Sequence, residues 1–237
     1  ITAKQIARDF AANTPPQQDG YWYANEYDKT ITDTLASAED VSVWSDELAS
    51  KVRDWSTLYE YGKNRQVLLH PFIELFKGKR VLEIGAGTGT ITRFLGENSK
   101  VVTSLEPSPE RYQSLCQRTR DLTNVNCLNE GIEFLVDDQA EYDLVVVVGV
   151  LEYAGVIFKD QDGGSMSPED RFVSLAKSKL AKDGLLIVAI ENKMGLRYLT
   201  PNREDHTSFY SESIHDFPNS TGIKTFTRRE LGALLKR

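Results

Sequence analysis

The chain has 237 residues, 40% of them hydrophobic, which is enough for one α/β domain and a modest appendage. Its formal net charge of −7, with no dense run of Lys or Arg, opposes binding to nucleic acid and favours a small or neutral partner. The two cysteines lack the spacing of a disulfide framework or a zinc site, and no apolar run approaches the roughly 18 residues of a membrane span. We therefore predict a cytoplasmic protein without membrane insertion.

The first 70 residues differ in character from the rest. They show helical spacing and no convincing strand, and they hold all three tryptophans and half of the ten tyrosines. We therefore predict an N-terminal helical cap over residues 1–70 and a second domain over residues 71–237. Near the end of the cap, the run LYEYGKNR places Tyr61 and Arg65 on one predicted helix. The absent initiating Met and the abrupt C-terminal end predict a piece of a longer polypeptide.

From Lys79 onward, apolar runs alternate with amphipathic segments, a pattern typical of a parallel sheet covered by helices on both faces. The predicted strands are Arg80–Ile84, Val101–Leu105, Val125–Leu128, Tyr142–Gly149 and Leu185–Ile190. Two connections are long, residues 155–166 and residues 192–224. The length of the second predicts a functional loop or a lid with short helices of its own.

Capping residues mark helix starts between these strands. Ser108 and Ser167, each followed by a proline, predict helices over residues 109–119 and 168–184. Thr227, with a glutamate three residues later, forms a capping box that predicts a terminal helix.

The most informative segment is VLEIGAGTGTITRFL, in which an apolar strand enters a glycine-rich turn that opens into a helix. Gly85, Gly87 and Gly89 remove side chains where the backbone turns tightly and approaches a bulky ligand, and Ala86 lies between the first two. A dinucleotide fingerprint requires its third glycine at position 90, which holds Thr90. The spacing therefore disfavours an NAD-dependent oxidoreductase.

This GxGxG turn, preceded by Glu83, resembles motif I of the class I methyltransferases that bind S-adenosylmethionine. The resemblance implies a Rossmann-like α/β fold whose parallel core is ordered 3-2-1-4-5. The antiparallel strand pair that ends the sheet in this family is missing from the sequence, so we expect five strands, with an exposed edge at the fifth strand unless another segment covers it. The resemblance also implies S-adenosylmethionine as the cofactor and S-adenosylhomocysteine as the product.

Candidate cofactor contacts follow the same order along the chain. Glu106 ends the second strand, where a carboxylate can accept hydrogen bonds from both ribose hydroxyls. Glu83 has two interpretations: its carboxylate meets the amino group of the cofactor, or it tethers the glycine turn through backbone N–H groups. By resemblance, the loop after the third strand contacts adenine, the end of the fourth strand lies beside the methyl group, and a helix of the cap packs over the cofactor. The residues assigned in this way are Ala86, Pro107, Asn129, Glu130, Gly149, Val150, Leu151, Tyr61 and Arg65, besides the three glycines.

The fragments AIENKMGLRYL, EDHTSFY and FPNSTGIKTFTRREL resemble methyltransferase domains associated with glycosyltransferases of bacterial surface-polysaccharide biosynthesis. The resemblance implies methylation of a hydroxyl on a sugar or glycan intermediate, with a glycosyltransferase domain in the same polypeptide as a partner. A hydroxyl acceptor needs a base, and His206, oriented by Asp205, is the candidate. A histidine that only caps a helix is the alternative. The commoner LEH after the fourth strand is LEY here, which removes another base.

Two other functions stay open. A non-catalytic cofactor-binding domain that positions a glycosyltransferase would keep the fold, and an oxidoreductase would need the missing glycine. The chain lacks the NPPY tetrapeptide and the Pro-Cys pair of nucleobase methyltransferases. Asp143, Asp160 and Asp162 do not form the metal site of catechol-type enzymes, so we predict no metal.

Overall fold

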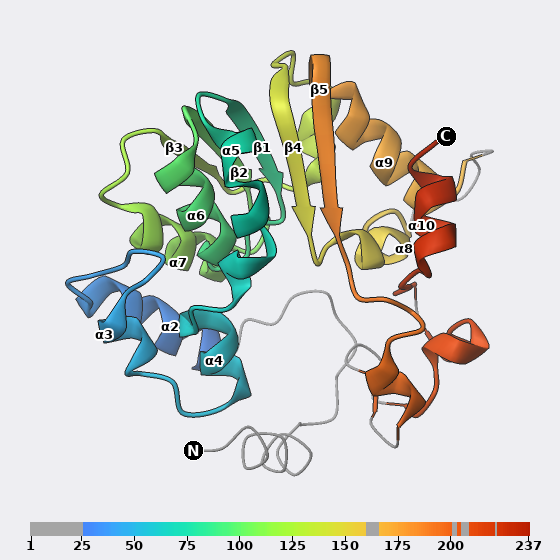
Figure 1. The fold of residues 1–237 in the computed structure, drawn as a ribbon, viewed down its shortest axis with the longest axis horizontal. Coiled ribbons are helices and arrows are strands. Elements are labelled where there is room, and N and C mark those ends of the chain that lie inside the picture. The colour runs from blue at the N-terminus through green and yellow to red at the C-terminus, as the bar shows by residue number, and fades with distance from the viewer. Residues whose placement is uncertain (1–25, 160–165, 201–202, 205–208, 221) are drawn as a thin grey trace.

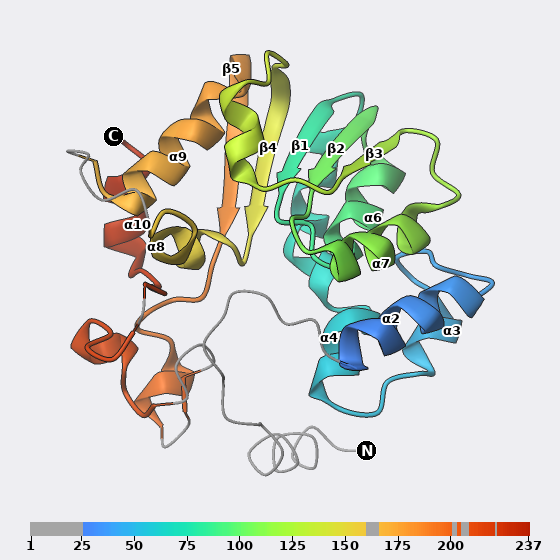
Figure 2. The ribbon, with the colours of Figure 1, turned by 180° about the vertical axis from the view of Figure 1, so that it is seen from behind.

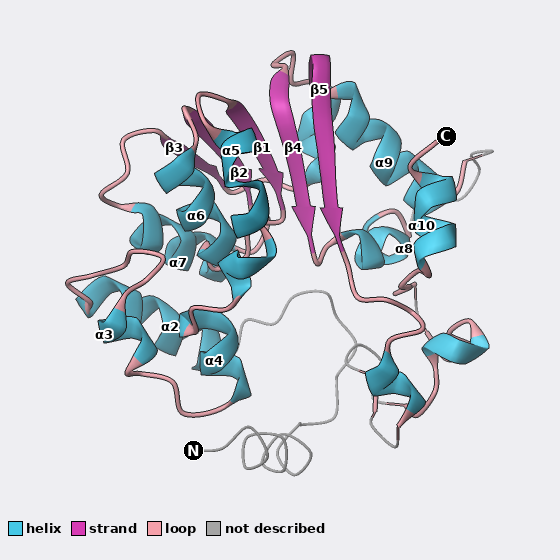
Figure 3. Cartoon of the chain, in the orientation of Figure 1, coloured by secondary structure: helices cyan, strands magenta, loops and turns pink. Residues whose placement is uncertain are grey.

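The structure, a computed structural model, describes residues 26–159, 166–200, 203–204, 209–220 and 222–237. Its centre is a five-stranded parallel sheet of order β3-β2-β1-β4-β5, with helices on both faces (Figure 1, Figure 3). The strands are β1 (Arg80–Ile84), β2 (Val101–Leu105), β3 (Val125–Leu128), β4 (Tyr142–Val148) and β5 (Leu180–Ala189). The predicted fold class and strand order are confirmed.

Strand β4 shows why the sheet is covered on both faces. Its run YDLVVVV sends successive side chains in opposite directions, because side chains alternate along a strand. Val145 and Val147 join one apolar cluster, whereas Leu144 and Val146 join the other. Both clusters lie in the core, so helices must exclude water from each face.

The predicted N-caps are confirmed. The side chains of Ser108, Ser167 and Thr227 each accept a hydrogen bond from a backbone N–H in the first turn of a helix. These helices are α7 (Pro109–Thr119), α9 (Pro168–Ser178) and α10 (Arg228–Leu234), and α6 (Thr90–Asn98) follows the glycine turn directly. Figure 3 shows α6 on one face of the sheet and α9 on the other.

The boundary between α9 and β5 differs from the prediction. The helix ends at Ser178 rather than at Gly184, because the chain from Leu180 already pairs with Tyr142 of β4. The register then shifts before the rest of β5 pairs, and Asp183 takes a φ of 63° in this irregular stretch. Strands β4 and β5 also each end one residue earlier than predicted.

The described part of the predicted cap, residues 26–70, holds helices and no strand. These are α2 (Glu26–Ser37), α3 (Asp46–Ala49), α4 (Trp55–Tyr61) and the 3₁₀ helices η1 (Arg65–Leu68) and η2 (His70–Phe72), which lead into α5 (Ile73–Phe76). Ile31, Leu35 and Tyr61 belong to a small apolar core within the cap. Because Gly62 ends α4, Tyr61 and Arg65 lie on two short elements and not on the single predicted helix.

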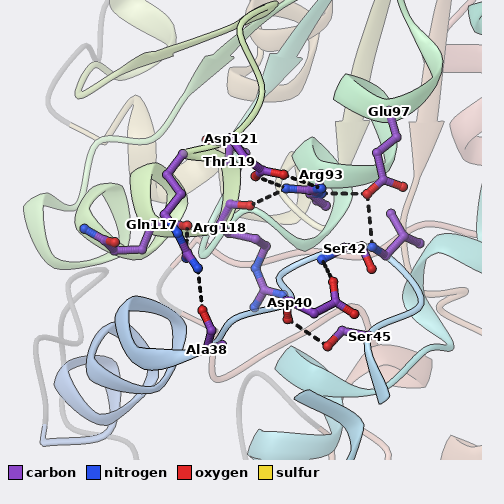
Figure 4. A network of polar contacts seen from close by, with 12 residues as sticks. Ala38, Asp40, Ser42, Ser45, Arg93, Glu97, Gln117, Arg118, Thr119 and Asp121 are labelled. Carbon is purple, nitrogen blue, oxygen red and sulfur yellow. Dashed lines mark hydrogen bonds and ion pairs between the residues drawn. The ribbon is translucent and has the colours of Figure 1, made fainter. Parts of the chain in front are cut away.

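Polar contacts attach the predicted cap to helices that cover the sheet (Figure 4). Arg93 of α6 forms an ion pair with Glu97, and Glu97 accepts a hydrogen bond from the backbone N–H of Val43 at 3.2 Å. Arg120, after α7, donates to the carbonyl oxygen of Ala38. Helix α2 packs along α7. Figure 1 shows the cap at the edge of the sheet toward which the strands point.

Residues 192–224, which we term the insert, leave β5 and precede α10. Their described part contains the short helices η5 (Leu196–Leu199) and η6 (Ser213–His215), as the long-loop prediction expects. The buried carboxylate of Glu204 accepts hydrogen bonds from the backbone N–H and the hydroxyl of Ser213, at 3.1 and 2.5 Å. Figure 2 shows the insert and the cap on opposite sides of the same sheet edge.

Short elements also follow two other strands: η3 (Ile132–Val136) after β3, and η4 (Leu151–Tyr153) and α8 (Ala154–Ile157) after β4. An isolated parallel bridge between Asn192 and Phe226 places the segment before α10 beside the chain that leaves β5. Within the described ranges, no helix combines the length and the apolar character needed to cross a membrane.

Candidate functional site

The glycine turn between β1 and α6 has a backbone that other residues rarely adopt. Gly85, Gly87 and Gly89 have φ angles of 77°, 58° and 88°. A Cβ on Gly85 would lie 2.4 Å from Val150 Cγ2, and one on Gly89 would lie 2.9 Å from Leu115 Cδ1. A Cβ on Gly87 would meet no atom within 4 Å. The turn therefore packs closely at both ends and presents bare backbone to open space at its centre.

Glu106 holds the turn from the end of β2. Its two carboxylate oxygens accept hydrogen bonds from the backbone N–H of Gly87 at 2.7 Å and of Ser108 at 2.9 Å. The side chain is 5% exposed, and burial raises its pKa while the two hydrogen bonds oppose the shift. Because a carboxylate offers about four lone-pair positions, Glu106 keeps acceptor capacity for further hydroxyl groups.

Glu83 is buried beneath the turn. One carboxylate oxygen accepts hydrogen bonds from Thr92 Oγ1 at 2.6 Å and from Ser104 Oγ at 2.8 Å. Burial raises the pKa of Glu83 to about 7, and the two hydroxyls and the charge of Arg65 oppose this shift. Glu83 thus ties β1 to α6 and β2 through side-chain hydroxyls. This differs from the tethering interpretation, in which backbone N–H groups were the partners. Its contact with a cofactor stays a prediction.

An apolar cavity of about 190 Å³ opens where β1, β2 and β4 end. Ligands of open α/β sheets collect at this edge. The cavity brings together Gly85, Pro107, Glu130 and Val150 from the predicted cofactor residues, with the apolar side chains Ile84, Leu105, Ile132, Ile157 and Phe172. Asn129 supports the edge, because its Nδ2 donates to the carbonyl oxygens of Glu106 and Pro107 at 2.8 and 3.1 Å.

Three other predicted residues shape the sheet edge through backbone and packing contacts. Ala86 donates its N–H to the carbonyl oxygen of Leu105 at 2.9 Å. Gly149 has a φ of 67° and donates to the carbonyl oxygen of Ala189 at 2.9 Å. Leu151 is buried in the apolar cluster of the sheet. The structure thus gives each of them a role in positioning the strand ends.

Arg65 and Tyr61 have different surroundings. The guanidinium carbon of Arg65 lies 3.8 Å from the ring centroid of Tyr59. The positive charge of Arg65 also acts to lower the pKa of Glu83. Tyr61 packs in the core of the cap. The aromatic ring beside Arg65 is therefore Tyr59, which is not among the predicted cofactor residues. Because α4 ends at Gly62, the helical spacing does not continue from Tyr61 to Arg65.

His206 and Asp205 lie outside the described residues. The ends of their loop are described, since the backbone N–H of Glu204 donates to the carbonyl oxygen of Phe209 at 2.9 Å beside an antiparallel bridge. Among the side chains that the structure describes, no group of three or more His, Cys, Asp or Glu could hold a metal ion. The roles of His206 and Asp205, and the expectation of no metal, stay predictions.

A buried polar cluster behind the turn was missed by sequence reasoning. It consists of Glu60 of α4, Thr88 of the turn and Arg118 of α7. Charged residues are usually exposed, so nothing in the sequence indicates that these side chains meet in the interior.

A family model described as a methyltransferase domain matches residues 56–237. The curated ribosomal RNA small subunit methyltransferase A of Streptococcus gordonii is 38% identical over 69 residues, which make up 29% of this chain and 23% of that protein. The chain thus spans less than a quarter of the curated relative that it matches.

Two solved structures share the fold. The DhpI-SAM-HEP complex is 16% identical, with coverage of 100% of this chain and 90% of that chain and a TM-score of 0.53. Coclaurine N-methyltransferase bound to N-methylheliamine and SAH is 19% identical, with coverage of 94% and 65% and a TM-score of 0.50. Because the family model extends over most of the chain, the chain belongs to the methyltransferase-domain family.

Proposed function

We propose that this chain binds S-adenosylmethionine at the glycine turn and transfers its methyl group to an acceptor. One observation carries the proposal: the bare backbone of the turn, the anchored carboxylate of Glu106 and the apolar cavity adjoin one another at the carboxyl edge of the sheet. The DhpI complex contains SAM (S-adenosylmethionine), and the coclaurine N-methyltransferase structure contains SAH (S-adenosylhomocysteine), which supports the choice of cofactor.

When bound, S-adenosylmethionine would supply an electrophilic methyl group on a sulfonium. Glu106 would accept hydrogen bonds from the ribose hydroxyls, and the cavity beside Glu130 would enclose the adenine ring. Arg65 would pair with the carboxylate of the cofactor, close to Glu83 and the turn. In-line transfer then depends on an acceptor held about 3 Å from the methyl carbon.

For the acceptor, we propose a hydroxyl of a sugar or glycan intermediate in surface-polysaccharide biosynthesis, methylated in the cytoplasm by a polypeptide that also carries a glycosyltransferase. Support comes from the sequence fragments of the insert, which borders the same sheet edge as the cap (Figure 2). His206 would accept the proton of the hydroxyl, with Asp205 orienting its imidazole. Under this proposal, the acceptor binds at the insert.

Calorimetry with S-adenosylhomocysteine and with NAD tests the cofactor, and we expect binding of the first compound only. Absence of binding, or preference for NAD, would contradict the proposal. Labelled S-adenosylmethionine incubated with nucleotide sugars and oligosaccharides tests the acceptor. Transfer to a sugar hydroxyl would support it, and transfer to an amine would overturn the hydroxyl assignment alone. Binding without any transfer would favour a non-catalytic scaffold.

A further inference from the structure

We propose that Glu60 of the cap is a positioning residue for the cofactor loop, and that it acts through the hydroxyl of Thr88. The inference rests on the proposed function, because it assigns the cap a role in the same cofactor site. It makes α4 part of the structure that shapes the glycine turn, although α4 precedes β1 in the chain.

The geometry of the cluster carries this proposal. Thr88 Oγ1 donates a hydrogen bond to Glu60 Oε2, and Arg118 Nε donates to the carbonyl oxygen of Thr88 at 2.9 Å. Arg118 Nη2 donates to the carbonyl oxygen of Glu60 at 3.1 Å and lies 3.8 Å from its Oε2. Glu60, Thr88 and Arg118 are 9%, 4% and 3% exposed. Water therefore competes little for these bonds, and the loss of the Thr88 hydroxyl leaves Glu60 Oε2 with the longer hydrogen bond from Thr90 Oγ1, at 3.4 Å.

The turn needs such support because its glycines are conformationally free. Gly87 and Gly89 flank Thr88, and both have positive φ angles that only glycine adopts readily. Glu106 holds the N–H of Gly87 from the side of β2, while Glu60 holds the side chain of Thr88 from the side of the cap. Two carboxylates from different elements thus fix adjacent residues of the turn. We expect this arrangement to preform the bare backbone at Gly87 before a ligand arrives.

A comparison of Thr88→Val, which removes the hydroxyl, with Thr88→Ser, which keeps it, tests this role of Glu60. We expect Thr88→Val to weaken binding of S-adenosylhomocysteine about tenfold and Thr88→Ser to stay within about twofold of the wild type. Thr119→Val is the matched control: Thr119 is equally buried, and its hydroxyl donates to Leu115 O at 2.9 Å without touching the turn. This control should lose stability and keep its affinity.

Hydrogen exchange of residues 85–90 in the ligand-free protein is the second readout. Exchange should accelerate in Thr88→Val and stay unchanged in Thr119→Val, because only the first variant releases the turn. Glu60→Ala combined with Thr88→Val should lose less affinity than the product of the two single losses, since both variants remove the same bond.

Equal behaviour of Thr88→Val and Thr119→Val in both affinity and exchange would overturn the inference and reduce the cluster to a general contribution to stability. A wild-type chain that fails to bind S-adenosylhomocysteine would instead refute the proposed function. The exchange measurement needs no ligand, so it would still decide whether Glu60 and Thr88 shape the turn.

Discussion

The cap side and the insert side of the molecule use polar contacts differently. On the cap side, several contacts join the cap to α6, α7 and the glycine turn, far away in the sequence: the hydroxyls of Thr32 and Ser114 are 2.7 Å apart, and Glu60 binds Thr88. In the described part of the insert, most hydrogen bonds join residues of the insert itself, as Glu204 and Ser213 do, although Lys224 also donates to Glu152. The cap is thus fixed to the half of the sheet beside the glycine turn, where we propose that the cofactor binds and which we term the cofactor half, whereas the insert folds largely on itself.

This difference separates the two tasks that we propose for the chain. The cofactor half is assembled from the cap, the glycine turn and β2, so a change in one element reaches the others. A loop with mostly internal contacts can change its sequence without disturbing the sheet. We therefore expect substitutions near the turn to alter cofactor binding and stability, and substitutions in the insert to alter turnover.

Gly85→Ala should produce the largest loss of stability. Its Cβ would meet Val150 Cγ2 at 2.4 Å, and its φ of 77° is unfavourable for alanine. Overpacking and the left-handed backbone together should lower the free energy of unfolding by about 3 kcal/mol or more. Gly78→Ala is the control, since its φ of 72° is similar but no atom lies within 4 Å. Urea unfolding should show about 1 kcal/mol for this control; equal losses would contradict the packing argument.

Glu83→Gln should change how stability depends on pH. Burial raises the pKa of Glu83 from 4.5 to about 7, so between these values the folded protein keeps a proton that the unfolded chain has lost. Stability from this group is therefore present below pH 4.5 and falls as pH rises to 7, by an amount on the order of 3 kcal/mol. Unfolding without ligand from pH 5 to 8 should show a smaller fall in the variant. An equal or steeper fall would refute this assignment.

Local chemistry explains how much of the fold was predictable. The N-caps at Ser108 and Ser167 depend on a few adjacent residues, and the apolar run of β4 depends on burial of both faces. The end of α9 at Ser178 was predicted wrongly because it depends on pairing between Leu180 and Tyr142, which are distant in sequence. Boundaries set by a tertiary partner override local helix signals.

The candidate site divides in the same way. Gly85 and Glu106 were predictable because their spacing follows from the strand–turn–helix geometry. The buried contact between Glu60 and Thr88 was not, because it joins two elements that only the tertiary fold brings together. Tyr59 was missed for a related reason, since Gly62 ends α4 and the chain then changes direction.

His206→Ala tests the insert side of the comparison. If His206 accepts the proton of the acceptor, its loss should slow turnover about a hundredfold and leave binding of S-adenosylhomocysteine unchanged. Single-turnover rates with an acceptor found by the labelling assay measure the first effect, and calorimetry measures the second. A loss of cofactor affinity in this variant would mean that His206 contributes to cofactor binding. It would contradict the proposal that the insert acts only on the acceptor.

Glu106→Ala tests the cofactor side. It removes the acceptor of the N–H of Gly87 and the predicted partner of the ribose hydroxyls, so affinity for S-adenosylhomocysteine should fall by about 1 to 3 kcal/mol. Glu204→Ala is the matched control, because Glu204 is also 5% exposed but binds Ser213 within the insert. Calorimetry should show normal affinity for this control, and similar losses in both variants would show that the two halves are coupled.

The smallest expected effect concerns single hydroxyl groups. Thr32→Val removes the bond to Ser114, which is fully buried, and should lower the free energy of global unfolding by about 1 kcal/mol. Ser220→Ala removes bonds to the N–H and carbonyl of Ile223 within the insert. This loss should stay below about 0.5 kcal/mol, because a locally bonded turn opens before the sheet unfolds. In native-state hydrogen exchange, the cap should then open with the same free energy as the sheet, and the insert should open with a lower one. Equal losses of unfolding free energy in the two variants would mean that the cap and the insert unfold together.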